Sequence, residues 1–129
     1  AERLQRYRER KQAVQKVKEQ WMYGTEENVI EAVWNAVCRF EVYSFETVQG
    51  LRFHYKIRGK ELFFSRKEKS VTRATVDKAV KTVLDLQRQR KEISGPKKLN
   101  CFGASYLYPV FIRIGLISET QFKSAGYYG

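Results

Sequence analysis

The chain has 129 residues, 43% of them hydrophobic and 14% aromatic, which is enough apolar material for one folded domain and too little for two. The eighteen aromatic side chains exclude wholesale disorder, and the absence of any run of 18 apolar residues excludes a membrane-spanning helix. The outlying quantity is charge: 25 Lys and Arg residues against 14 Asp and Glu residues give a net charge of +11, which favours nucleic acid or another polyanion as the partner.

The excess positive charge falls in separate blocks. Residues 1–20 carry a net charge of +4, residues 52–73 carry +6 and residues 86–98 carry +4, whereas residues 21–51 carry −4. A protein that is basic only for solubility would spread its excess charge along the chain. Separate blocks can instead converge on one face after folding.

Two helices are expected at the N-terminus. Apolar residues at intervals of three, four and seven predict a basic helix over residues 3–21, which Gly24 ends. Thr25 is a good N-cap for a second helix, whose apolar side chains recur at helical spacing. These side chains are Val29, Ile30, Val33, Trp34, Val37 and Cys38.

The apolar period then changes to two, which is typical of strands. Residues 40–48 and 51–58 are predicted to form two antiparallel strands. Residues 59–60, Gly-Lys, suit a two-residue hairpin turn to a third strand. In that hairpin, Phe63 would lie beside Lys56 on the outer side of the sheet.

Ser70 or Thr72 is expected to cap a third helix that runs to about Arg90. Its core face holds Val76, Ala79, Val80, Val83 and Leu84. Residues 97–103 are expected to form a loop and residues 105–114 a short buried helix. We expect Pro109 in the first turn of that helix, and a capping box at residues 118–121 to start a last helical turn.

The sequence lacks the residue patterns of the common enzyme classes. His54 is the one histidine, and it lies in a strand among basic residues. Cys38 belongs to a core face, whereas Cys101 lies in a loop near Lys97 and Lys98. We expect Cys101 to be a partly buried thiol, the alternative being a thiol whose pKa these charges lower. Two cysteines and one histidine at these separations match no zinc site, and there is no glycine-rich phosphate loop. We therefore predict that the protein is not an enzyme and has no catalytic residue, metal or cofactor.

The strongest binding signal is a row of basic residues in one strand. Arg52, His54, Lys56 and Arg58 alternate with apolar residues, so their side chains lie about 6.5–7 Å apart on one face. That spacing is comparable with the distance between phosphates along a nucleic-acid strand. Phe63 would offer a ring on which a base can stack. The alternative interpretation is a solvated face whose charges only keep the protein soluble.

Further basic residues flank the third helix. Arg66, Lys67 and Lys69 precede it and Arg73 lies in its first turn, where loop amides and the helix dipole favour phosphate. Beyond its other end, cations can stabilise the helix without any ligand. The candidate nucleic-acid-binding residues are Arg52, His54, Lys56, Arg58, Lys60, Phe63, Arg66, Lys67, Lys69, Arg73, Lys97 and Lys98.

Between Thr25 and Arg90, the order helix, three strands, helix resembles that of the double-stranded-RNA-binding domain. That family has a Lys-Lys-x-Ala-Lys run at the start of its final helix, whereas here Lys67-Glu68-Lys69 precedes the cap and Thr72-Arg73-Ala74-Thr75 follows it. The family's Gly-Pro-x-His loop is replaced by Val48-Gln49-Gly50-Leu51. The likeness is one of element order and implies an α+β fold.

These patterns predict one α+β domain over residues 1–129, with helices packed on a small three-stranded antiparallel sheet in the order α-α-β-β-β-α-α. Residues 1–23 would form a basic helix that can project, residues 25–90 the core, and residues 97–126 short C-terminal helices. Nothing at the N-terminus resembles a signal peptide and there are only two cysteines, so we expect a cytoplasmic protein with no membrane partner.

The expected function is non-enzymatic binding of DNA or RNA, the choice between them being left open, alone or within a nucleoprotein complex. The alternative is a small interaction module or inhibitor, of phage or mobile-element type, that docks on a nucleic-acid-processing enzyme. In that interpretation the acidic residues 26–46 and the aromatic tail would contact the partner protein.

Overall fold

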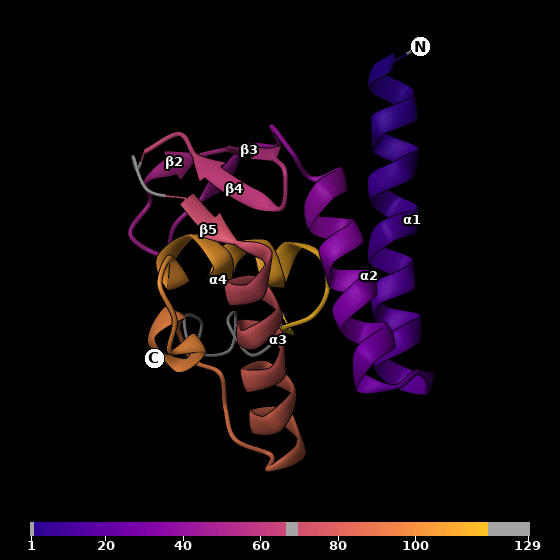
Figure 1. Ribbon diagram of the computed structural model, residues 1–129, viewed down its shortest axis with the longest axis vertical. Coiled ribbons are helices and arrows are strands. Elements are labelled where there is room, and N and C mark those ends of the chain that lie inside the picture. The colour runs from indigo at the N-terminus through magenta and orange to yellow at the C-terminus, as the bar shows by residue number, and fades with distance from the viewer. Residues whose placement is uncertain (1, 67–69, 119–129) are drawn as a thin grey trace.

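The computed structural model describes residues 2–66 and 70–118, and Figure 1 shows its arrangement. Within these residues, four α-helices pack with two small antiparallel sheets. In chain order the elements are α1 (Glu2–Tyr23), α2 (Glu26–Arg39), β1 (Phe45–Glu46), β2 (Arg52–Phe53), β3 (Tyr55–Arg58), β4 (Glu61–Phe64), β5 (Ser70–Thr72), α3 (Arg73–Arg88), the 3₁₀ helix η1 (Pro96–Leu99) and α4 (Ala104–Arg113). The predicted α+β fold is confirmed.

The two helices predicted at the N-terminus are present, and in the structure they pack as an antiparallel pair. Thr25 is the N-cap of α2, and its side chain accepts a hydrogen bond from the backbone N–H of Asn28. Six residues of α2 are buried, whereas α1 buries only Ala13 and Val17 because most of its side chains are charged or polar. The N-terminal half of α1 extends beyond α2 (Figure 1).

The hairpin of β3 and β4 has the predicted register. Lys56 pairs with Phe63 across the strands, and Gly59 adopts a φ of +62° in the turn, a conformation that glycine reaches without strain. The inner side chains are buried, Ile57 only partly, and the outer ones apart from Glu61 are exposed, because one face of the sheet covers the core.

Two predictions about the strands were wrong in detail. The strand expected over residues 40–48 is reduced to β1, because Phe40 is the C-cap of α2 and Val42 has a φ of +61°. The strand expected over residues 51–58 is divided at His54 into β2, which pairs with β1, and β3. The third strand of the main sheet is β5, which pairs with β4.

The helices that follow complete the core. Thr72 caps α3, which buries the five predicted apolar residues and ends at Arg88. In α4, Pro109 lies inside the helix rather than in its first turn. Tyr106 of α4 is buried and its ring lies 4.8 Å from those of Phe53 and Phe64, so α4 closes the inner side of both sheets. The expected capping box lies outside the described residues, except for Ser118. In the described part of the chain, no helix is both long and apolar enough to cross a membrane.

Candidate nucleic-acid interface

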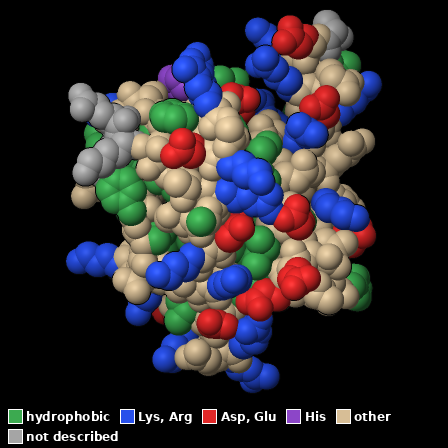
Figure 2. Space-filling view, viewed as in Figure 1, with side chains coloured by type: hydrophobic (Ala, Val, Ile, Leu, Met, Phe, Trp, Pro, Cys, Tyr) green, Lys and Arg blue, Asp and Glu red, His purple; other side chains and the backbone are tan. Residues whose placement is uncertain are grey.

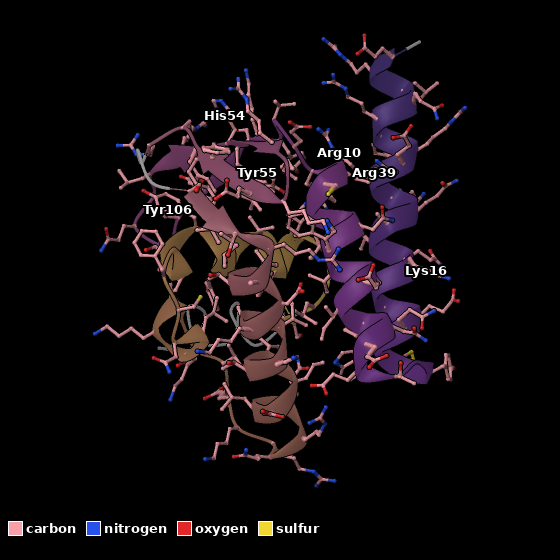
Figure 3. The ribbon with its side chains drawn as sticks, in the orientation of Figure 1. Arg10, Lys16, Arg39, His54, Tyr55 and Tyr106 are labelled. Carbon is pink, nitrogen blue, oxygen red and sulfur yellow. The ribbon has the colours of Figure 1, made fainter. Side chains whose placement is uncertain are left out.

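The outer face of the β3–β4 hairpin carries most of the residues predicted to bind nucleic acid. Lys56 and Arg58 of β3 are exposed, whereas Tyr55, the first residue of β3, is fully buried. His54 is exposed between the buried Phe53 and Tyr55, and its backbone N–H and C=O are both hydrogen-bonded to Ser65, the residue that follows β4. Figure 3 shows His54 at the outer edge of the sheet and Tyr55 on the side toward α2.

We define the outer face as the exposed side chains of β2, β3, β4 and their adjoining turns. Its members are Arg52, His54, Lys56, Arg58, Lys60, Phe63 and Arg66. Within residues 2–66 and 70–118, none of its Lys or Arg side chains forms an ion pair. Their charge is therefore not neutralised by a carboxylate in the described part of the protein.

Phe63 is the aromatic member of the outer face. It pairs with Lys56 on one side and with Ser70 on the other, and 38% of its surface is exposed. A large apolar ring exposed between polar neighbours on a flat sheet can stack on a base.

Two acidic residues, Glu61 and Glu46, lie beside members of the outer face. Glu61 pairs with Arg58 and with Thr72, is half-buried, and accepts a hydrogen bond of 3.0 Å from the hydroxyl of Ser70. Glu46 lies opposite Arg52 in the smaller sheet. The basic side chains of the outer face therefore surround Glu61, and they do not form an uninterrupted positive surface.

Arg73 lies apart from this face. Its guanidinium pairs with the carboxylates of Glu31 and Asp77 and lies 5.3 Å from the centre of the Trp34 ring. Only 21% of its side chain is exposed. These contacts direct Arg73 toward α2, so it joins α3 to α2 instead of pointing toward the outer face.

The remaining basic candidates do not add to the outer face. Lys67 and Lys69 lie outside the described residues. Lys97 and Lys98 are exposed on η1, which packs against α3 and α4. In Figure 1 this orange segment lies below α4, on the side away from β3 and β4.

Sequence reasoning missed a second arrangement of arginines around Tyr43. The guanidinium carbons of Arg10 and Arg113 lie 5.1 and 5.2 Å from the centre of the Tyr43 ring, and both also lie near Phe40. Arg113 Nε donates a 3.0 Å hydrogen bond to the Tyr43 hydroxyl. Because these residues come from α1, α4 and the segment after α2, no local pattern joins them. The one signal in the sequence is the helical spacing of Arg3, Arg6 and Arg10.

Figure 2 shows where these charges lie on one face of the molecule. Blue side chains stand at the top, both beside the purple histidine on the sheet and on the projecting end of α1, where red side chains are interspersed.

A separate apolar groove of about 1280 Å³ runs between α1, the β1–β2 turn and α4, with Trp21, Met22 and Val48 among its lining residues.

The cysteines show no feature of a reactive site. Burial raises the pKa of both thiols, and for Cys101 it outweighs the opposing effect of Lys78. Cys101 is thus a partly buried thiol, and the lowering of its pKa considered for Lys97 and Lys98 does not occur, because desolvation dominates. In the part of the chain that the structure describes, no group of three His, Cys, Asp or Glu residues could hold a metal ion.

No protein-family model, curated protein or solved structure matches this chain.

Proposed function

We propose that the protein binds nucleic acid through the outer face and acts as a binding protein rather than as an enzyme. The observation that carries this proposal is the exposed Phe63 ring beside Lys56, with Arg58 and His54 on the same face. Cations next to an exposed ring are what a single strand requires, since its phosphates need neutralising and its bases need a surface for stacking.

The geometry of β3 supports contacts with successive phosphates. Side chains two residues apart in a strand are separated by about 6.5–7 Å, so Lys56 and Arg58 can each approach a different phosphate. His54 continues this row, and Lys60 lies in the turn at its end. The hairpin is also anchored from beneath, because the inner residues Tyr55, Leu62 and Phe64 are buried. A rigid support keeps the row in place without a ligand.

The test is fluorescence anisotropy with single- and double-stranded DNA and RNA over a range of salt concentrations. We expect micromolar or tighter binding, a clear preference for one form, and a steep dependence on salt. The variant with Arg52, Lys56 and Arg58 all changed to alanine should reduce the slope of log K against log salt by about 2–3, since each lost phosphate contact removes about 0.7–0.9.

A matched control has the same loss of charge at a distance from the outer face. Lys16→Ala, Lys97→Ala and Lys98→Ala together remove three exposed cations from α1 and η1. An equal loss of affinity in the two triple variants would contradict the proposal, because it would mean that only the net charge matters. Weak binding that is equal for all four nucleic acids and lost at physiological salt would also overturn it, in favour of the protein-docking module.

The aromatic contact has its own test. Phe63→Ala should weaken single-strand binding by about fivefold to about 100-fold, since stacking of a base on an aromatic ring contributes about 1–3 kcal/mol. The salt slope should not change, because no charge is removed. An unaltered affinity in a folded Phe63→Ala protein would show that the ring makes no contact with bases.

A further inference from the structure

A basic hollow, distinct from the outer face, lies between α1 and the segment that follows α2. Its volume is about 490 Å³. The lining residues are Glu2, Arg3, Arg6, Arg10, Val42, Tyr43 and Ser44. Arg3, Arg6 and Arg10 are spaced by three and four residues, so they share one side of α1 and extend over about 10 Å of its length.

Arg10 is a fixed charge in this hollow. Its Nε donates to the carbonyl of Arg39 at 3.1 Å and one terminal nitrogen donates to the carbonyl of Glu41 at 3.2 Å. Its guanidinium is also stacked on the Tyr43 ring. These contacts use two of its five N–H groups, so the group is held in place with donors remaining. Arg10 forms no ion pair with any residue that the structure describes.

The other two arginines are exposed and available. Arg6 pairs with Glu2 at 3.2 Å, but the side chains are 53% and 83% exposed, and such a pair contributes little. Arg3 has neither an ion pair nor a side-chain hydrogen bond within residues 2–66 and 70–118. Three guanidinium groups against one loosely held carboxylate leave the hollow positively charged.

The neighbouring carboxylates point elsewhere. Glu9 faces Arg39 at 3.9 Å. The carboxylate of Glu41 accepts a 2.9 Å hydrogen bond from the backbone N–H of Ile57 in β3. Arg113, whose guanidinium carbon lies 5.2 Å from the centre of the Tyr43 ring, adds a further positive charge. The Ser44 hydroxyl contributes a neutral donor to the lining.

We propose that this hollow binds a phosphate group, and that the phosphate belongs to a nucleic-acid strand that continues from the outer face. Guanidinium groups match phosphate oxygens in charge and in hydrogen-bonding geometry. The second part of the proposal rests on the proposed function, whereas the first part does not.

The hollow is next to β3, which supports a continuous path. Val42, which lines the hollow, donates its backbone N–H to the carbonyl of Tyr55 at 2.9 Å. Tyr55 lies between His54 and Lys56 of the outer face. The turn at Val42 therefore separates the two basic surfaces, and Figure 1 shows the projecting end of α1 at the level of β3. A strand bound to β3 would need to pass Val42 and the Glu41 carboxylate, which is bonded to Ile57 at this edge of β3, to reach the arginines.

The experiment combines two probes with a matched pair of variants. Pyrophosphate is titrated while the Nε–H signals of the arginines are followed by NMR, and a 12-nucleotide single strand of the preferred nucleic acid is titrated by anisotropy. The test variant is Arg3→Gln with Arg6→Gln, which leaves Arg10 in place. The control variant is Arg8→Gln with Lys11→Gln, which removes the same charge from exposed positions of α1 that do not line the hollow.

We expect pyrophosphate to shift the signals of Arg6 and Arg10. The test variant should bind the oligonucleotide about tenfold more weakly and lose about 0.7 from its salt slope, since the contact with one phosphate of a single strand is removed. The control should change affinity less than about twofold, because it removes only general charge. Thermal melting of both variants should match that of the unaltered protein.

The two parts of the proposal fail separately. If pyrophosphate moves neither signal and the test variant binds the oligonucleotide as the control does, the phosphate site is overturned while the outer face can still bind nucleic acid. If pyrophosphate shifts both signals in a protein that binds no oligonucleotide, the phosphate site is supported and the proposed function is overturned. The source of the phosphate is then a small anion.

Discussion

The hydroxyl of Tyr55 in β3 donates a hydrogen bond of 2.6 Å to the carbonyl of Val37 in α2. Both residues are fully buried, and burial raises the pKa of Tyr55 well above its usual value, so the phenol keeps its proton. Val37 belongs to the last turn of α2, and its carbonyl also accepts a longer bond of 3.3 Å from the backbone N–H of Phe40. The Tyr55 hydroxyl supplies the shorter of the two bonds to this buried carbonyl and joins the sheet to the helical pair.

Tyr55→Phe should lower the free energy of unfolding by about 0.5–1.5 kcal/mol, because the buried Val37 carbonyl would lose its shorter hydrogen bond and keep only the one from the Phe40 N–H. Urea denaturation checks this, and the midpoint should fall with an unchanged slope. Tyr7→Phe is the control, since Tyr7 is 60% exposed and should lose almost no stability. Equal midpoints for Tyr55→Phe and the unaltered protein would show that the bond contributes nothing net.

Gly103 lies where α4 meets the sheet. Its φ is +78°, and a Cβ added there would lie 2.6 Å from Cγ2 of Val71 in β5. Gly103→Ala should therefore lower the melting temperature by several degrees, since it combines backbone strain with a clash in a packed core. Gly95→Ala is the matched control in the same connection, because its backbone is extended and a Cβ would meet nothing within 4 Å. Similar melting temperatures for the two variants would contradict this account.

Substitution of Arg73 distinguishes a structural role of this residue from a role in binding nucleic acid. Arg73→Ala removes the contacts with Glu31, Asp77 and Trp34 that join α3 to α2. We expect a loss of about 1–2 kcal/mol in the free energy of unfolding and less than about a twofold change in nucleic-acid affinity. Lys56→Ala should show the reverse, because Lys56 is exposed and has no ion pair among the described residues. A larger loss of affinity from Arg73→Ala than from Lys56→Ala would restore Arg73 to the interface.

The hairpin register was predictable because two constraints agree. The alternation in β3 and β4 places Tyr55 and Leu62 inside, and Gly59 suits the turn between the strands. The segment after α2 was not predictable in the same way. Phe40 and Phe45 keep their apolar character, but Val42 adopts a positive φ that glycine or asparagine more often takes, so the apolar pattern suggested a longer strand.

The candidate site likewise contains residues whose placement could be predicted from the sequence and residues whose placement could not. The outward direction of Lys56 and Arg58 follows from strand alternation alone. The pairing of Arg73 with Glu31, 42 positions away in the chain, depends on how α3 packs against α2. The arginines around Tyr43 also come from separate segments, which only the tertiary fold brings together.

Asp77 is a carboxylate whose burial costs stability. Its Oδ1 is buried and has no hydrogen-bond partner among the described residues, and desolvation raises its pKa despite the attraction of Arg73. At neutral pH the folded protein must keep this partly buried group charged, whereas in the unfolded chain it is hydrated. Asp77→Asn should therefore raise the melting temperature at pH 7 by about 1–3 °C.

The effect of Asp77→Asn on the melting temperature should depend on pH. Because the folded pKa is raised, the carboxyl of the folded protein gains its proton first as the pH falls, and this relieves the cost of burial. The advantage of Asp77→Asn should shrink as the pH is lowered toward 4. Asp85→Asn is the control, since that side chain is 58% exposed in its pair with Arg88. An advantage of Asp77→Asn that grows on acidification would mean that the attraction of Arg73 outweighs desolvation.

The thiols of Cys38 and Cys101 should react slowly with iodoacetamide at pH 7.5. Both side chains are half-buried, and burial raises the pKa of each thiol, so the reactive thiolate is scarce. In 8 M urea both should react at the rate of an ordinary cysteine peptide, because desolvation is lost on unfolding. Mass spectrometry of timed samples measures the two sites separately. Fast alkylation of Cys101 alone in the folded protein would show that Lys78 outweighs burial and that the loop holds a reactive thiolate.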